Sequence, residues 1–403
     1  MTAASTHSST ASSPHQQAMP AKRRLDYVDA LRGAACLWVL LHHTFEHKPA
    51  PAGFWHYPAA LVVLVANIGW LGVSMFLVLS GFCLFYPLAA RYEQQGIQLK
   101  LSTFARRRAL RILPPYYIAL LLLVPLDLFV SHHRSHHWDW HAVLHGPKDI
   151  LLHLFMLHNL SASTIGSVTP ALWSLALECQ LYLVFPLLVW SVMRFGLKSI
   201  LAATFVVAVV WQSLCYRHFG FSLVWTPQLA VYYHALPGRC FEFAAGMAAA
   251  SFVARPRPGQ GRIALALILI PLVPALYFVS EVSRFGPLCD QAWGVIFAAA
   301  LVLLGHVPDA LFQRSAGLRS LVWVGAISYS VYLLHQPLIN LLSLRQLHIQ
   351  ESAAGGFAEG LLRLPLLVGI GYLFHLFFER PFMPGRPRTE RQAEVAAAIS
   401  PAP

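Results

Sequence analysis

Two residues that could do chemistry, Arg32 and His43, lie in one apolar segment. Their spacing of eleven residues is three helical turns plus about 20°, so in a helix both side chains face the same way, roughly 16 Å apart. Such groups are costly inside a membrane helix and mark functional sites. The structural alternative is that Arg32 snorkels to the headgroups and a neighbouring carbonyl satisfies His43. Arg32 can also pair with Asp29, three residues before it.

A second group of candidates is a cluster of arginines before a double proline. Its members are Arg106, Arg107, Arg108 and Arg111. Arg108 and Arg111 project from adjacent positions of a helix face, and such a pair suits a polyanion because each guanidinium can bind phosphate oxygens bidentately. The enrichment of lysine and arginine on the cytoplasmic side of membrane proteins explains some of these arginines, but not all of them. The prolines at 114–115 predict that the helix breaks there.

Two polar stripes follow. Ser174, Glu178 and Tyr182 recur every four residues along an apolar helix in which Glu178 is the only carboxylate. A buried carboxylate needs a cation, a histidine or a donor. Glu178 either forms a structural pair, with Arg239 for instance, or orients His43 near the same membrane face. Tyr329, Tyr332 and His335 are three apart and form the other stripe.

The composition is that of a polytopic membrane protein. Hydrophobic residues make up 57% of the 403 residues and charged residues 11%, against about 25% charged in soluble domains. The net charge is +12, and the basic residues lie at the ends of apolar runs. This placement is explained by the orientation of the chain in the membrane rather than by nucleic-acid binding. We therefore predict an all-α bundle of about ten transmembrane helices, N-in/C-in. The predicted spans are 27–46, 60–88, 112–131, 173–193, 199–217, 236–254, 263–280, 289–305, 321–343 and 360–379.

Outside this bundle we predict disordered cytoplasmic tails at 1–24 and 383–403, leaving 25–382 as the membrane domain. The stretch 149–172 is too short to span and should re-enter or pack against the outer surface. A histidine-rich loop at 132–145 resembles a metal-binding tract but lacks the order of a catalytic site, so we predict no metal. The six cysteines contain no CxxC pair and are interpreted as core residues.

Six ordered segments together resemble the acyltransferase-3 family, integral-membrane enzymes that modify O-antigens, exopolysaccharides, Nod factors and macrolides. They are residues 25–33 with His43, 72–82, 106–117, 172–182, 327–335 and 378–382. The resemblance implies an Arg-x10-His motif, matched by Arg32 and His43, with the histidine needed for catalysis. It also implies an Arg-x-x-Arg motif, matched by Arg108 and Arg111. The sequence departs from the family at Cys179 and Ser74, where acids are common.

The residues and the resemblance together predict a bacterial inner-membrane O-acyltransferase. It would move an acyl group, foremost acetyl, from cytoplasmic acyl-CoA to a hydroxyl of a cell-envelope or exported glycan or glycolipid. His43 would accept the hydroxyl proton, either in direct transfer or through an acyl-histidine, and Glu178 and Arg32 would assist. We predict no cofactor, because acyl-CoA is the co-substrate. The residues expected to bind acyl-CoA are Arg107, Arg108, Arg111 and Tyr116. The supporting residues are Asp29, Trp173, Ser174, Tyr182, Ser328, Tyr329 and His335.

Two other functions stay open. One is acylation of a small, macrolide-like secondary metabolite, which the short loops do not distinguish from glycan acylation. The other is non-enzymatic transport of polyprenyl-linked or acyl cargo. A transporter more commonly shows repeated halves with broken helices at corresponding positions, and the sequence contains no such repeat.

Overall fold

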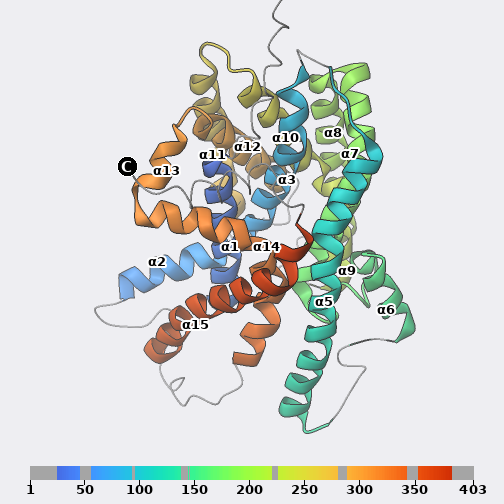
Figure 1. Cartoon of the computed structure of the whole chain (residues 1–403), viewed down its shortest axis with the longest axis vertical. Helices are drawn as coiled ribbons and strands as arrows, with labels where there is room; N and C mark the ends of the chain where they lie inside the picture. Colours follow the sequence, from blue (N-terminus) through green and yellow to red (C-terminus); the bar gives the residue numbers. More distant parts are fainter. Residues whose placement is uncertain are drawn as a thin grey trace, which may run out of the picture.

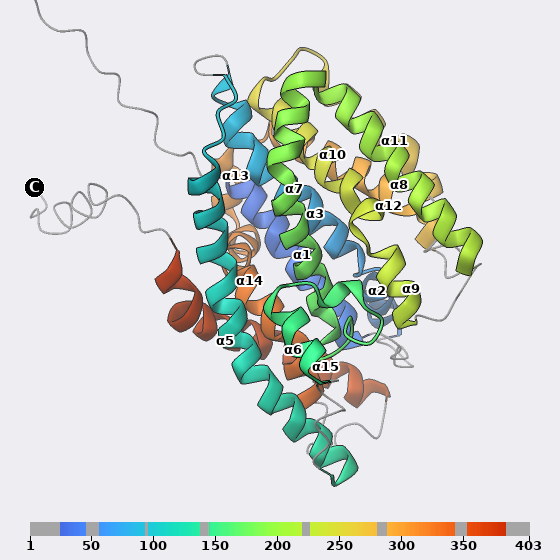
Figure 2. The ribbon, with the colours of Figure 1, turned by 90° about the vertical axis from the view of Figure 1, so that its right-hand side faces the viewer.

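The computed structural model describes residues 25–45, 56–92, 96–137, 144, 146–219, 226–279, 288–342 and 353–383. Helices joined by turns and short irregular segments make up this described part, which contains no strand, so the predicted all-α fold is confirmed. Figure 2 shows α5 along one side of the bundle, α8, α11 and α12 toward the other side, and α1, α3 and α7 between them. The predicted tails, except Met383, lie outside the described residues.

Ten long helices carry the architecture (Figure 1). They are α1 (Asp26–Phe45), α3 (Leu71–Ala89), α5 (Leu101–Ser135), α7 (Trp173–Phe195), α8 (Leu197–Phe219), α10 (Leu236–Ala254), α11 (Gln260–Val279), α12 (Cys289–Leu304), α14 (Ala316–Leu342) and α15 (Ala353–Phe374). Shorter elements are α2 (His56–Asn67), α6 (Pro147–Leu154), α9 (Pro227–Tyr233), α13 (Asp309–Arg314), two 3₁₀ turns at 158–160 and 170–172, and a π-helical turn at 375–379 followed by a 3₁₀ turn at 380–382.

Six helical segments of the described part are long and apolar enough to cross a membrane. They are Leu71–Ala89, Leu101–His133, Pro170–Phe195, Leu197–Phe219, Ala316–Leu342 and Phe357–Phe382. A spanning helix needs about 20 predominantly apolar residues. The molecule is therefore a multi-pass membrane protein.

Helix α1 lies inside the bundle and touches α14 backbone to backbone. A Cβ added to Gly33 would lie 2.0 Å from the Leu321 carbonyl oxygen, and one added to Gly325 would lie 1.8 Å from the Asp29 carbonyl oxygen. Small residues at a helix contact allow this approach, which is a common packing device in membrane bundles. The α1–α14 contact therefore fixes the two helices that carry His43 and His335.

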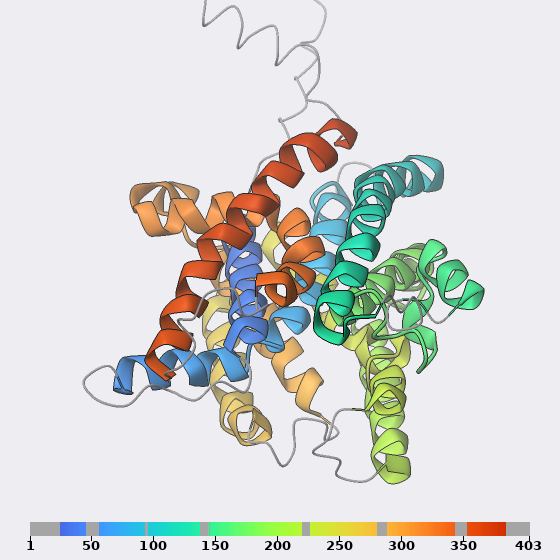
Figure 3. The same cartoon turned by 90° about the horizontal axis from the view of Figure 1, so that it is seen from below.

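The predicted single span 60–88 is wrong, because the chain turns at residues 68–70 between α2 and α3. A Cβ on Gly69 would lie 2.4 Å from the Trp38 carbonyl oxygen, so glycine is needed where α1 passes the turn. Trp38 Nε1 also donates a 2.8 Å hydrogen bond to the Val65 carbonyl oxygen. Figures 1 and 3 show α2 pointing away from the bundle centre. Hydropathy counts apolar residues and does not detect this change of direction.

The predicted helix break at the double proline is also wrong, since α5 continues through Pro114, Pro115 and Pro125. Proline removes an N–H donor, but packed membrane helices tolerate it because neighbouring groups satisfy the freed carbonyls. Nearby, Tyr329 of α14 donates its hydroxyl to the Ile112 carbonyl oxygen at 2.8 Å. The arginine cluster therefore lies within α5 and not in front of it.

The segment that was predicted not to span forms α6 and the two 3₁₀ turns that precede α7. It packs against α5 and α7. Tyr117 of α5 donates to the Leu154 carbonyl oxygen at 2.6 Å, and Gln180 of α7 donates to Asn159 Oδ1 at 2.8 Å. Of the histidine-rich loop, His141 and His145 lie outside the described residues.

Candidate active site

One end of the candidate site is Arg32, near the start of α1. Its Nη1 donates to Asp29 Oδ1 at 2.8 Å, the pair that the three-residue spacing suggests, and its Nη2 lies 3.2 Å from Cys83 Sγ of α3. Both members of the ion pair are largely buried. Arg32 is thus held by α1 and α3 together and faces the interior of the bundle.

The other end is a group of histidines from α1 and α14. The His43 ring centre lies 5.0 Å from that of His42 and 5.2 Å from that of His335. His42 is buried and its Nδ1 bonds the Ala66 carbonyl oxygen at 2.9 Å, so it joins α1 to α2 as a packing residue. His335 is buried too, whereas His43 is partly exposed. His43 is therefore the accessible imidazole of the three.

Hydrogen bonds hold α14 against the start of α7. The hydroxyls of Ser174 and Tyr332 are 2.5 Å apart, and both contact the Ala171 carbonyl oxygen, at 3.2 and 3.1 Å. Gln336 Oε1 accepts from the Ala171 backbone N–H at 2.7 Å and from the Thr169 hydroxyl at 3.0 Å. This network closes the helix N-terminus and fixes Tyr332 three residues from His335.

Glu178 lies one turn further along α7. It accepts hydrogen bonds from the hydroxyls of Ser80 in α3 and of Tyr182 in its own helix. The Arg108 guanidinium lies 5.7 Å from the centre of the Tyr182 ring. Glu178 thus sits with the arginine end of the site, and its hydrogen bonds go to hydroxyls rather than to His43.

The suggested pair of Glu178 with Arg239 is wrong, because Arg239 is bound elsewhere. Its Nε lies 2.7 Å from Glu242 Oε2 and its Nη1 lies 2.7 Å from Asp290 Oδ1. Its Nη2 donates to Ser74 Oγ at 3.1 Å, and Gln212 donates to Asp290 Oδ2 at 2.7 Å. These five side chains, here called the Arg239 cluster, join α3, α8, α10 and α12.

Sequence analysis did not predict the Arg239 cluster, in which Glu242 is only 1% exposed. The available signal was the i, i+3 spacing of Arg239 and Glu242 inside an apolar helix, which predicts a salt bridge on one face. No signal within α10 could have identified Asp290, which comes from α12.

The arginines of α5 differ in how far they are buried. Arg107 is exposed, while Arg108 and Arg111 are partly buried. The buried Nε of Arg108 has no hydrogen-bond partner. Arg108 and Arg111 therefore face the bundle, and Arg107 faces away from it.

The predicted role of Tyr116 in binding acyl-CoA does not fit its surroundings. Tyr116 is completely buried, and its hydroxyl donates to the His153 carbonyl oxygen at 3.1 Å. It fastens the α6 segment to α5. A side chain that is enclosed in this way cannot touch a ligand without rearrangement of the segment.

The remaining predicted residues make contacts between helices or within one. Trp173 stacks on His234 with ring centres 3.8 Å apart. Ser328 donates to the Gly325 carbonyl oxygen at 2.9 Å, and its own carbonyl accepts a 3.8 Å contact from Cys36 Sγ. These residues hold the helices that carry the site.

A buried polar cluster in the α6 segment also escaped the sequence analysis. His153 Nδ1 lies 2.9 Å from Asp149 Oδ1, which also accepts from the Ser167 hydroxyl at 2.8 Å. The His153 and His158 rings stack with centres 4.2 Å apart, and burial lowers the pKa of His158 to about 3. This stacked pair stabilises the segment that leads into α7.

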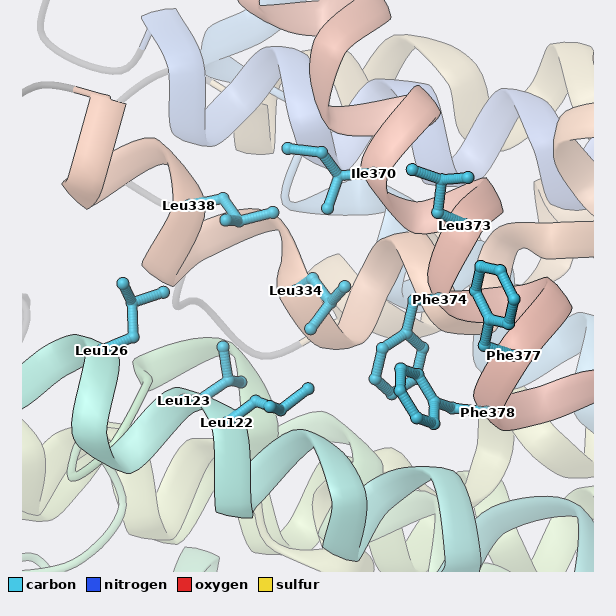
Figure 4. A pocket seen from close by; sticks show the side chains of 10 residues that line it. All are labelled: Leu122, Leu123, Leu126, Leu334, Leu338, Ile370, Leu373, Phe374, Phe377 and Phe378. Atoms are coloured by element: carbon cyan, nitrogen blue, oxygen red, sulfur yellow. The ribbon is translucent and has the colours of Figure 1, made fainter.

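An apolar groove flanks the histidine end of the site (Figure 4). It has a volume of about 260 Å³, and leucine, isoleucine and phenylalanine side chains of α5, α14, α15 and the π-helical turn line it. Leu334 and Leu338 line it from α14, next to His335. The groove is thus a hydrocarbon surface between α5, α14 and α15, and none of the three histidines lines it.

These features define an all-helical, multi-pass membrane protein in which buried and half-buried polar side chains lie between an arginine end and a histidine end. The chain belongs to the acyltransferase-3 family: the family model described as an acyltransferase domain matches residues 25–378. This agrees with the predicted family and with an enzyme that transfers acyl groups.

Three relatives illustrate the similarity. The chain is 27% identical to the peptidoglycan O-acetyltransferase OatA of Listeria monocytogenes over 78% of its own length and 49% of that protein. It is 26% identical to the putative peptidoglycan O-acetyltransferase YrhL of Bacillus subtilis, over 78% and 51%. It is 28% identical to the putative membrane-bound transacylase BcsY of Komagataeibacter xylinus, over 94% and 86%. The chain thus spans about half the length of the first two relatives. No solved structure shows significant similarity to it.

Proposed function

We propose that this protein is an inner-membrane O-acyltransferase that moves an acetyl group from cytoplasmic acetyl-CoA to a hydroxyl of a cell-envelope glycan. The observation that carries the proposal is the line of polar side chains between the two ends of the site. Tyr332, Ser174, Glu178 and Tyr182 lie between the His43 end and the Arg108 end. The names of two relatives, which are peptidoglycan O-acetyltransferases, support a glycan acceptor.

The topology that accompanies this function has about ten spans with both termini in the cytoplasm. Arg32 lies near the start of α1 and the arginine cluster near the start of α5. An excess of lysine and arginine marks the cytoplasmic side. The arginine end of the site then faces the cytoplasm, where acyl-CoA is, and His43 lies near the outer face, where the glycan is.

Arg108 and Arg111 would bind the phosphates of CoA at the inner end. Both side chains are partly buried, and the buried Arg108 Nε–H donates no hydrogen bond to a described residue, so it can donate one to a phosphate. A charge-assisted hydrogen bond from arginine to phosphate is roughly twice as strong as a neutral one. The pantetheine arm would extend from there toward His43.

At the outer end, His43 would act as general base. The acceptor oxygen forms a bond to the acyl carbon while its proton passes to the His43 imidazole. The bond between the acyl carbon and sulfur then breaks, and the proton of the imidazolium ends on the departing CoA thiolate. Atoms and charge balance with no further reactant.

The test is acetyl transfer by the purified full-length protein in liposomes, with acetyl-CoA and peptidoglycan fragments, followed as release of CoA thiol and by mass spectrometry of the glycan. Arg108→Ala should raise the KM for acetyl-CoA by about 10–150-fold, the effect of losing a contact worth roughly 1.5–3 kcal/mol. Arg194→Ala, at an exposed arginine in the last turn of α7, is the matched control and should leave that KM unchanged. Absence of acetylated glycan with the wild type would reject the proposal.

A further inference from the structure

We propose that His335 positions His43 by accepting a hydrogen bond from its imidazole, a role that rests on the proposed function of His43. The orienting role that sequence analysis suggested for Glu178 is thus transferred to a histidine of α14. The inference depends on three observations: the partner of His335 Nδ1, the lack of a partner at its Nε2, and the place of the His43 ring.

The first observation determines the tautomer of His335. Its Nδ1 lies 2.6 Å from the Tyr332 carbonyl oxygen. A carbonyl can only accept, so Nδ1 carries the hydrogen, and in the neutral ring Nε2 is left with a lone pair. The hydrogen bond of one ring nitrogen therefore sets the function of the other.

The second observation concerns this lone pair. His335 is 1% exposed, and its buried Nε2 has no hydrogen-bond partner among the residues that the structure describes. Leaving a buried polar atom unpaired costs free energy, on the order of 1–3 kcal/mol. A nitrogen of this kind, beside a partly exposed imidazole, indicates a partner that engages it in the working state.

The third observation identifies that partner. The ring centres of His335 and His43 are 5.2 Å apart, a separation at which ring nitrogens that face each other come within hydrogen-bonding reach. The other titratable groups beside His335 are His42 and Tyr332. His42 Nδ1 is engaged with the Ala66 carbonyl oxygen, and the Tyr332 hydroxyl with Ser174 and Ala171. His43 is the partly exposed ring of the three histidines.

The consequence is a fixed order of donors and acceptors. The Tyr332 carbonyl accepts from His335 Nδ1, and His335 Nε2 accepts from one N–H of His43. The other nitrogen of His43 then presents its lone pair to the acceptor hydroxyl. When His43 takes the hydroxyl proton, His335 stabilises the imidazolium through the same hydrogen bond, as the third member of a catalytic triad does. His335 itself touches no substrate and is a positioning residue.

Two variants separate this role from simple packing. His335→Phe keeps a flat ring and removes the acceptor, whereas His335→Gln removes the ring and places an oxygen near the position of Nε2. We expect His335→Phe to lower kcat by about 10–100-fold, the usual cost of losing a partner that orients a functional histidine, with the KM for acetyl-CoA unchanged. His335→Gln should recover most of the loss. The reverse order, Phe active and Gln inactive, would show that only packing matters.

A second readout does not require turnover. Diethyl pyrocarbonate reacts with the unprotonated nitrogen of an imidazole. Mass spectrometry of peptides measures the rate of this modification at His43 separately from that at the other histidines. The rate should fall in His335→Phe and recover in His335→Gln, while the control His42→Phe keeps the wild-type rate at His43. An unchanged rate in His335→Phe overturns the inference even if the wild type proves inactive in acetyl transfer. If His335→Phe does not fold, as judged by its melting temperature, His335→Leu replaces it in both measurements.

Discussion

The Arg239 cluster and the line of side chains from Arg32 to His335 are two polar regions in the same apolar bundle, and they differ in how completely their groups are paired. In the Arg239 cluster the guanidinium faces two carboxylates at 2.7 Å and the Ser74 hydroxyl at 3.1 Å. At the candidate site, the buried Arg108 Nε and His335 Nε2 have neither a hydrogen bond nor an ion pair to a described residue. Arg239 Nε and Glu242 Oε2 also make no hydrogen bond, but they form an ion pair with each other. A cluster whose charges satisfy one another stabilises the fold, whereas unused donors and acceptors are available to a substrate.

The difference also shows in exposure. Arg239 and Glu242 are 3% and 1% exposed, while His43, Arg108 and Arg111 are all partly exposed. Buried ion pairs hold helices in register but do not need to meet a ligand. Substitutions should therefore separate the two regions, with loss of turnover at one and loss of stability at the other.

The largest expected effect is on turnover at His43. His43→Ala should fold and insert normally, because alanine is the best helix former, and should lose about 10²–10⁴-fold in turnover, the usual contribution of a general base. The measurement is acetyl transfer per folded molecule in liposomes. His42→Ala is the control: it should lose the hydrogen bond to Ala66 and some stability but keep its turnover. Turnover of His43→Ala above a tenth of the wild type would remove His43 from the mechanism.

Arg239→Met should give the largest loss of stability. The substitution leaves Glu242 and Asp290 buried without their cation, and breaking a buried ion pair in this way costs about 3–5 kcal/mol. The unfolding midpoint in detergent should fall, with turnover per folded molecule unchanged. Replacing Glu242 and Asp290 by apolar residues as well should recover much of the stability. Wild-type stability with reduced turnover would assign the Arg239 cluster to catalysis instead.

Local patterns in the sequence were sufficient for individual helices. The span predicted at 236–254 has the bounds of α10, and the pairing of Asp29 with Arg32 follows from their spacing on α1. Both depend on contacts within one helix, where geometry is fixed at 3.6 residues per turn. The acyl-transfer chemistry likewise followed from ordered local segments, which the family match supports.

Contacts between helices could not be predicted, because they depend on how helices tilt and rotate against each other. Glu178 and His43 were expected to meet since each lies a few residues from the same face. In the structure Glu178 points to Ser80 of α3 and His43 to His335 of α14. For the same reason, the sequence did not show that Asp290 of α12 pairs with Arg239 of α10.

Glu178→Gln should have a moderate effect at the arginine end. Ser80 and Tyr182 both donate to the carboxylate, and glutamine weakens these charge-assisted hydrogen bonds to neutral ones. The difference is about 1.4 kcal/mol, or about tenfold, and should appear as a higher KM for acetyl-CoA because Arg108 lies over Tyr182. The check is the ratio of kcat to KM across pH. Loss of kcat above 100-fold with a shifted pH optimum would instead restore the hypothesis that Glu178 orients His43.

The smallest expected effect is at Tyr116, which sequence analysis placed in the acyl-CoA site and the structure places under α6. Tyr116→Phe removes one neutral hydrogen bond, to the His153 carbonyl oxygen, and should cost about 0.5–1.5 kcal/mol of stability. The ring stays buried in the same contacts, so the KM for acetyl-CoA and the turnover per folded molecule should not change. Tyr117→Phe, which removes the neighbouring hydrogen bond to the Leu154 carbonyl oxygen, is the matched variant and should behave alike. Thermal unfolding and donor titration measure both quantities on the same preparation. A tenfold rise in the KM for Tyr116→Phe alone would mean that the hydroxyl reaches the donor, and that the α6 segment moves aside when acyl-CoA binds.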